Sequence, residues 1–172
     1  MNTGKPTDAV SNLCPTCGLC CNGVLFADVE LRAGDDPRRL AKVGLTLEKK
    51  GRSKLAFTQP CACFNGKFCN IYADRPKRCR TFECGLLKCV QDGELEADAA
   101  LKTIARTKRQ VEKVRVLLRQ LGQNDEQVAM TKRYTQAMSA PNIFSGFNSE
   151  LRGELMLAVN DLMQVLQRDF LQ

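Results

Sequence analysis

The chain has 172 residues, ten of them cysteine and none of them histidine, and a formal net charge of +7. This length suits one domain, or a small domain with an appendage. The first residues lack the apolar run of a secretory signal, and no apolar stretch approaches the ~18 residues of a membrane span. We therefore expect a cytoplasmic protein with no membrane partner, in which cysteine clusters more often bind metal than form disulfides.

The positive charge is concentrated around the cysteines. Residues 1–60 carry 9 basic against 6 acidic side chains, and residues 61–93 carry 6 against 3. Metal-bound thiolates would add negative charge that the formal count omits, so much of this excess would be neutralised. We therefore do not expect nucleic acid as a partner. The sequence indicates neither a protein partner nor an oligomeric state.

The first 60 residues hold the first cysteine cluster and few regular elements. Residues 1–12 are polar and are predicted to be disordered. The cluster at 14–21 is followed by two predicted short strands, at 24–31 and 55–58, with a turn expected at 49–51. Between the strands, the acidic pair before Pro37 predicts a short helix that ends near Gly44.

The second cluster and the C-terminal helices follow. Pro76 is well placed to open a short helix that carries Cys79, with Gly85 expected at its end. Apolar residues at helical spacing then predict helices at 94–121, 124–139 and 149–171, separated by loops, with Thr107 the one weak position on the first apolar face. The fold class is therefore mainly α: a small irregular cysteine-rich metal-binding domain at 13–92 with short strands and helices, followed by a three-helix segment at 93–172.

The spacing of the first cluster is typical of a metal site. Cys14-x-x-Cys17 lets two sulfurs reach one ion, Gly18 suits the tight turn, and Cys20 repeats the spacing. Cys21 is adjacent to Cys20, and adjacent cysteines rarely serve one mononuclear site. The pattern therefore favours two four-thiolate centres or one multinuclear cluster. Zinc and iron–sulfur clusters both accept four cysteines, so the thiols alone do not distinguish these cofactors.

Basic residues flank Cys79 and offer charge compensation for buried thiolates. Because guanidinium gives up hydration more readily than ammonium, we expect Arg75 and Arg80 to face the thiols. Lys77 and Arg78 are expected to face solvent, and the ring of Tyr72 is expected to pack over the same site. The alternative is a solvated basic turn.

Two separated motifs carry a resemblance to a known family. They are Cys14-x-x-Cys-Gly-x-Cys-Cys21 and Cys69-x-Ile-Tyr-x-x-Arg-Pro-x-x-Cys-Arg-x-Phe-x-Cys84. Over roughly residues 13–90 the chain resembles the YkgJ family of bacterial cysteine-cluster proteins, described as zinc- or iron-chelating; the helical part from 94 on lies outside these motifs. The resemblance implies that the metal ligands are Cys14, Cys17, Cys20, Cys21, Cys61, Cys69, Cys79 and Cys84.

Two cysteines remain outside this set. The family's thiol before Cys69 falls on Cys61 or Cys63, and Cys61 is preferred because Cys63 lies where the family has small and apolar residues. Cys89 has no counterpart and lies on an apolar stretch, where a lone thiol is more often a small packing residue.

The resemblance also reaches an enzyme, because flagellin lysine methylase carries a similar cysteine domain in a longer chain. This sequence shows no glycine-rich loop that we can identify as a methyl-donor site. The main interpretation is a metal-binding protein that holds zinc or iron, including iron in an iron–sulfur cluster, through about eight thiolates. An enzyme of the methylase type, a redox protein with an iron–sulfur centre, and a metal-free disulfide scaffold are the alternatives.

Overall fold

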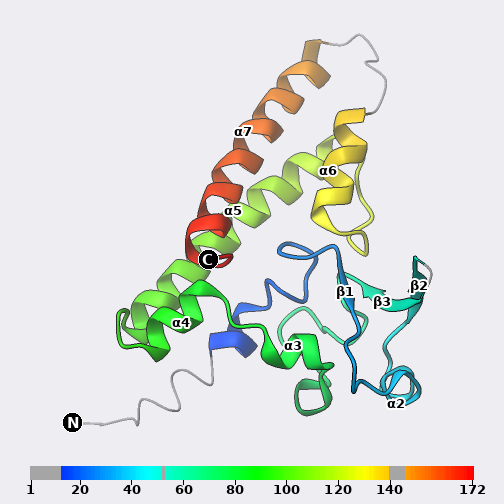
Figure 1. Cartoon of the computed structure of the whole chain (residues 1–172). Helices are drawn as coiled ribbons and strands as arrows, with labels where there is room; N and C mark the ends of the chain where they lie inside the picture. Colours follow the sequence, from blue (N-terminus) through cyan, green and yellow to red (C-terminus); the bar gives the residue numbers. More distant parts are fainter. Residues whose placement is uncertain (1–12, 52, 140–145) are drawn as a thin grey trace.

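The computed structural model describes residues 13–51, 53–139 and 146–172. The predicted disordered segment 1–12 lies outside the described residues, as does most of the loop expected before the last helix. Long helices form one part of the molecule, and a small sheet with irregular cysteine loops forms the other (Figure 1). The prediction of a mainly α, cysteine-rich chain is confirmed. Within the described residues, no helix combines the length and the apolarity needed to cross a membrane.

The long helices pack through the predicted apolar faces. Helix α5 (Ala97–Gln120) lies along α7 (Gly146–Asp169), and α6 (Met130–Ser139) packs beside α5. The weak position, Thr107, is fully buried, and its hydroxyl donates to the carbonyl of Thr103 at 2.9 Å. Because this hydrogen bond satisfies the hydroxyl, Thr107 can be buried, and the buried face of α5 continues through it. The buried residues of α7 include the six predicted ones: Leu151, Leu155, Ala158, Leu162, Val165 and Leu166.

The capping pattern predicted that the second helix of this segment starts at residue 124. The helix instead starts at Met130. Asp125 instead makes a local turn, in which its carboxylate accepts from the backbone N–H of Gln127 at 2.9 Å. The backbone N–H of Met130 donates to the carbonyl of Gly23 at 3.0 Å. The first cysteine loop therefore supplies a partner at the start of α6, and this tertiary contact overrides the local capping signal.

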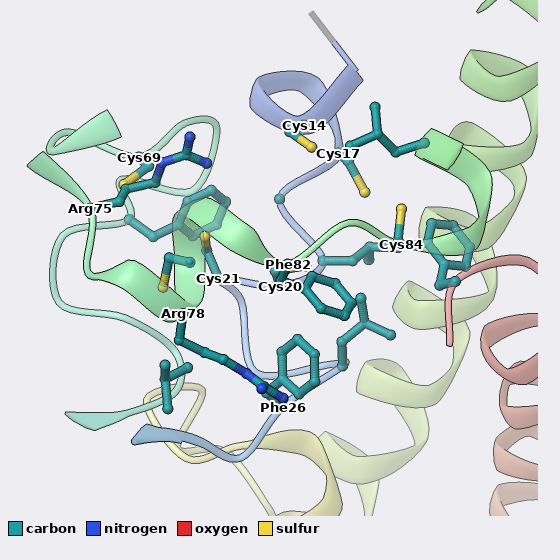
Figure 2. A pocket seen from close by; sticks show the side chains of 18 of the residues that line it. Cys14, Cys17, Cys20, Cys21, Phe26, Cys69, Arg75, Arg78, Phe82 and Cys84 are labelled. Carbon is teal, nitrogen blue, oxygen red and sulfur yellow. The ribbon is translucent and has the colours of Figure 1, made fainter. Parts of the chain in front are cut away.

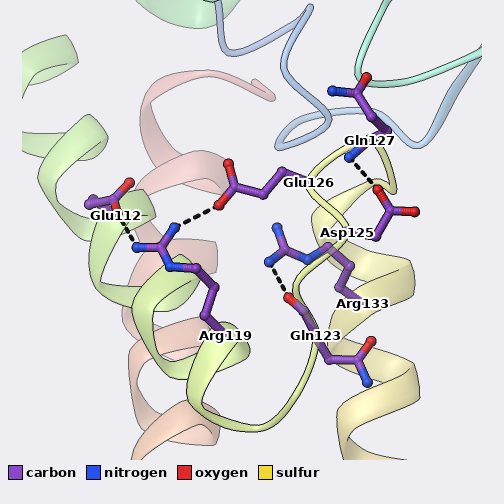
Figure 3. Close-up of polar contacts among 7 residues, drawn as sticks. All are labelled: Glu112, Arg119, Gln123, Asp125, Glu126, Gln127 and Arg133. Carbon is purple, nitrogen blue, oxygen red and sulfur yellow. Dashed lines mark hydrogen bonds and ion pairs between the residues drawn. The ribbon is translucent and has the colours of Figure 1, made fainter.

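Polar contacts hold the connection between α5 and α6 (Figure 3). Arg119 on α5 pairs with Glu112 at 2.7 Å and with Glu126 in the connection at 2.6 Å. Arg133 on α6 is buried and donates to the backbone carbonyl of Gln123. These contacts stabilise the conformation of the connection between α5 and α6. The connection in turn positions the start of α6 against the first cysteine loop.

The sheet is small and antiparallel. Its strands β1 (Asp28–Glu30), β2 (Glu48–Lys50) and β3 (Lys54–Thr58) lie in the order β1-β3-β2. The two strands predicted from sequence are confirmed, although β1 is shorter than expected, and β2 occupies part of the expected turn. Val29 faces Phe57 across the first pair, and both are buried.

Short helices complete the cysteine-rich part. Helix α2 (Pro37–Lys42) begins as predicted, with the Asp36 carboxylate accepting two backbone N–H groups. The 3₁₀ turn η1 (Tyr72–Asp74) precedes α3 (Lys77–Thr81), which carries Cys79. Gly85 was expected to end this helix but begins the next one, α4 (Gly85–Gln91), and its N–H donates to the carbonyl of Phe170 at 3.3 Å.

Two hydrophobic cores result. The larger lies among α4, α5, α6 and α7 and includes Leu13, Leu19 and Val24 from the first cysteine loop. The smaller lies under the sheet and consists of Val29, Leu40, Leu45, Phe57, Cys61 and Cys63. The cysteine-rich part thus contributes residues to the helical core, and the division of the chain at residue 92 stays a prediction.

Candidate metal centre

The first cysteine loop is shaped by a tight turn after a helical segment at 13–17. The backbone N–H of Cys21 donates to the carbonyl of Gly18 at 2.9 Å. Gly18 has a left-handed φ of +69°, and a Cβ there would lie 2.8 Å from Cζ of Phe64. A side chain at this position would therefore be both strained and crowded, which explains the glycine inside the cysteine motif.

The second cysteine segment lies against the first. The backbone N–H of Cys61 donates to the carbonyl of Cys21 at 2.9 Å, and the N–H of Asn70 donates to the carbonyl of Cys63 at 2.8 Å. Cys79 lies on α3, and Cys84 immediately precedes α4. Residues about 40 to 70 positions apart in the sequence are thus brought to one place.

A cavity of about 280 Å³ lies between these segments (Figure 2). Seven of the eight predicted ligands line it, and the eighth, Cys61, is buried and joined by its backbone to Cys21. All ten cysteines are free thiols. The seven that line the cavity are Cys14, Cys17, Cys20, Cys21, Cys69, Cys79 and Cys84.

The eight thiols fall into two groups by what surrounds them. Cys14, Cys17 and Cys84 pack against the helical core, whereas Cys61 and Cys79 belong to or pack against the sheet core. Cys20 directly follows Leu19 of the helical core. The carbonyl of Cys21 accepts from the N–H of Cys61, and Cys69 pairs with Phe64, which packs against the sheet core. We call Cys14, Cys17, Cys20 and Cys84 the helix-side group, and Cys21, Cys61, Cys69 and Cys79 the sheet-side group.

Burial makes these thiols poor acids in the absence of a cation. Desolvation, followed by the charge of neighbouring thiols, raises the pKa of Cys21 and Cys79 to about 12. For Cys17 and Cys61, desolvation outweighs a backbone hydrogen bond that opposes it, and the pKa rises to about 11 and about 12. The pKa of Cys20 is also raised. A bound metal cation would reverse this tendency, because it stabilises the thiolate form.

Backbone amides near three of the thiols oppose the effect of burial. The amide of Leu19 lowers the pKa of Cys17, and the amide of Cys63 lowers that of Cys61, in each case less than burial raises it. The amides of Leu87 and Leu86 lower the pKa of Cys84 in the same way, against the larger effect of its burial. Amide donors of this kind favour the thiolate and orient it for a metal ion.

The basic residues around the thiols differ in part from the prediction. Arg75 lines the cavity as expected, stacks on the ring of Tyr72 with Cζ 3.5 Å from the ring centroid, and lowers the pKa of Cys21. The expectation for Arg80 was wrong, because Arg80 does not line the cavity. Arg78 is exposed, as expected, but it also lines the cavity. On a helix, Arg78 shares a face with Phe82 four residues later, and Arg80 points elsewhere.

The two remaining cysteines lie near members of the two groups, but neither lines the cavity. Cys63 is buried, and its sulfur donates to the carbonyl of Val43 at 3.4 Å. That contact occupies the thiol near the end of α2 and favours Cys61 over Cys63 as the ligand. Cys89 is half-buried on α4 and does not line the cavity, so its assignment as a packing residue stays a prediction.

The cysteine sulfurs around the cavity are suitable ligands for a metal, but their side chains do not all point at one common position. Among the residues that the structure describes, no three cysteine, aspartate or glutamate side chains form a group that could hold an ion as they lie. The thiols nevertheless surround one cavity, with amide and cationic partners beside them. Sulfur donors in such surroundings are the ligands that zinc and iron–sulfur clusters use in proteins.

The fold and this site define a cysteine-cluster protein, in which a small thiol-lined part joins a helical segment. A family model described as "CxxCxxCC: Putative zinc- or iron-chelating domain" matches residues 13–116, and the chain belongs to this family. The match confirms the resemblance found in the motifs and extends it beyond residue 90 into α5, where Ile104 lines the cavity and Lys108 donates to the carbonyl of Thr16 at 2.6 Å. No curated protein and no solved structure matched the chain.

Replacement of Arg75 tests charge compensation at this site. We expect Arg75→Gln to weaken metal retention roughly 10-fold, because it removes the cation that favours the thiolates of Cys21 and Cys79. Competition with a chelator of known affinity would measure the change. Lys77→Gln and Arg80→Gln are matched controls, since both side chains are exposed and neither lines the cavity. Equal losses in all three variants would mean that only the overall charge matters.

Proposed function

We propose that this protein chelates zinc or iron through eight thiolates, those of the helix-side and sheet-side groups together. The observation that carries the proposal is the gathering of seven of these thiols around one cavity, with the eighth joined to it through the backbone of Cys21. Scattered structural cysteines would have no reason to share a cavity with Arg75 and with amide donors to sulfur.

Binding through these residues requires thiolates, and this sets the expected pH dependence. Burial raises the pKa of the thiols, so the metal must displace protons from them. Apparent affinity should therefore fall as the pH falls, because protons compete more strongly for the same sulfurs. The free-energy cost of removing these protons is reduced by the charge of Arg75 and by backbone amides near Cys17, Cys61 and Cys84.

The metal is identified by purification under anaerobic conditions. A brown protein with matching iron and acid-labile sulfide would establish an iron–sulfur centre, whereas a colourless protein with stoichiometric zinc would establish a zinc site. We expect one of these two results, with the metal lost when the eight thiols are replaced by serine. A colourless chain without bound metal, which also fails to take up zinc or iron when reduced, would refute the proposed function.

A redox protein or enzyme that uses an iron–sulfur centre is the second candidate. It is favoured by the apolar wall of the cavity, where Phe26 and Phe82 pack edge to face with centroids 5.1 Å apart and which also includes Leu25. Apolar walls with a few polar groups are typical of small-molecule sites. The brown colour described above is a requirement for this candidate, and a colourless zinc protein excludes it.

A further inference from the structure

The thiols divide along the line between the two hydrophobic cores. Cys14, Cys17 and Cys84 pack against the helical core, and Figure 2 shows them on one side of the cavity, with Cys21 and Cys69 on the other. Cys61 and Cys79 belong to or pack against the sheet core. The separation of these five thiols therefore follows from the packing around them.

The backbone around the other three thiols follows the same division. Cys20 comes directly after Leu19, which is fully buried in the helical core. The carbonyl of Cys21 accepts from the backbone N–H of Cys61 at 2.9 Å, and Cys69 pairs with Phe64, which packs against the sheet core. The two groups therefore meet at the adjacent residues 20 and 21.

Cations lie beside both groups. Lys108, on α5, donates to the carbonyl of Thr16, the residue before Cys17 on the helix side. Arg75 lines the cavity and acts on thiols of both groups, because its charge opposes the rise in the pKa of Cys21 and Cys79 and also that of Cys14. Two negatively charged centres need charge compensation at two places, and the structure provides it at two places.

We infer that the cavity holds two separate four-thiolate centres, one for each group, with Cys20 and Cys21 serving different centres. This inference rests on the proposed function and specifies it. Cys14, Cys17, Cys20 and Cys84 bind the first ion or cluster, and Cys21, Cys61, Cys69 and Cys79 bind the second. Four thiolates complete the coordination of a tetrahedral ion or of an iron–sulfur cluster, so neither centre needs to share a ligand with the other.

Cobalt titration of paired serine variants tests this division. The probe is Co²⁺ alone, added to the reduced, metal-free full-length chain, because cobalt bound by four thiolates in a tetrahedral site is coloured and replaces zinc in such sites. The same-group pairs are Cys14→Ser with Cys84→Ser, and Cys69→Ser with Cys79→Ser. The cross-group pair is Cys84→Ser with Cys79→Ser. The control pair, Cys63→Ser with Cys89→Ser, removes as many thiols from outside both groups.

We expect the unmodified chain and the control pair to bind two cobalt ions with the full tetrahedral spectrum. Each same-group pair should keep half of that absorbance, and the cross-group pair should lose nearly all of it. The remaining centre in each same-group pair reports that the chain has folded, and circular dichroism of the long helices reports the same for the cross-group pair. Equal loss in same-group and cross-group pairs, whether partial or complete, would overturn the division and indicate one shared cluster. An unmodified chain that binds none of cobalt, zinc and iron would instead refute the proposed function.

Discussion

Anaerobic removal of the metal should abolish amide protection in the sheet and leave the long helices protected. In hydrogen-exchange measurements, we expect the amides of β3, α2 and α3 to exchange at least 100-fold faster in the metal-free chain, while those of α5 and α7 change little. Strand β3 is the most informative probe, because it is central in the sheet and pairs with a strand on each side.

The physical reason is the difference in size between the two cores. The sheet core consists of six buried residues, two of which are cysteines, and no tryptophan contributes to it. Among the residues that the structure describes, the helical core contains twenty buried ones. A core as small as the former supplies little free energy of folding, so a metal that ties Cys21 to Cys61, Cys69 and Cys79 would supply much of the remainder.

The control for this experiment is reloading with the original metal, which should restore the protection of β3. If protection in β3 were the same with and without metal, the sheet would be stable by itself, and the role of the metal in folding would be wrong. Loss of protection in α5 and α7 as well would show that the two cores unfold as one unit.

The substitution Gly23→Ala should be among the most destabilising single changes in the chain. Gly23 has a φ of +77°, and a Cβ there would lie 3.1 Å from Cα of Ala129 and 3.1 Å from Cδ of Pro60. Its carbonyl also accepts from Met130 at the start of α6. Left-handed backbone costs a non-glycine residue about 1–2 kcal/mol, and overpacking costs about 1–3 kcal/mol. We therefore expect the free energy of unfolding to fall by about 2–5 kcal/mol.

Urea unfolding of the metal-loaded chain, followed by circular dichroism, would measure this loss. Gly34→Ala is the matched control, since its φ is +95° and no atom lies within 4 Å of the added Cβ. It should cost only the backbone term of about 1–2 kcal/mol. Equal losses in the two variants would show that the first cysteine loop moves away from Ala129 and Pro60 without penalty. A larger loss at Gly23, together with weaker metal retention, would show that the contact with α6 holds the loop in place.

Local patterns determined the elements whose signals lie in neighbouring residues. The spacing of Leu151, Leu155 and Leu162 predicts the buried face of α7, and Asp36 before Pro37 predicts the start of α2. The chemistry of the candidate site was also evident, because thiols at Cys-x-x-Cys spacing in a chain without histidine favour few other roles. The family match over residues 13–116 agrees with that interpretation.

Other predictions failed where the partner lies far away in the sequence. Helix α6 begins at Met130 because Gly23 supplies an acceptor, and no residue near 124 reveals this contact. Gly85 begins α4 while bonded to Phe170, which lies at the other end of the chain. The expectation that Arg80 faces the thiols failed for a local reason. The bounds of α3, taken with helical periodicity, place Arg78 on the same face as Phe82, and Arg80 on another face.

The sequence by itself determined that the protein is mainly α and that thiols dominate its chemistry, and its resemblance to the family supplied the eight candidate ligands. Only the tertiary structure decided that Cys63 bonds to Val43, that Cys14, Cys17 and Cys84 pack against a helical core, and that Cys61 and Cys79 lie in or against a sheet core. The physical reason is that residue type and spacing determine local conformation and ligand chemistry. The grouping of thiols depends on packing between segments as much as 70 residues apart, and those contacts leave no signal in the neighbouring sequence.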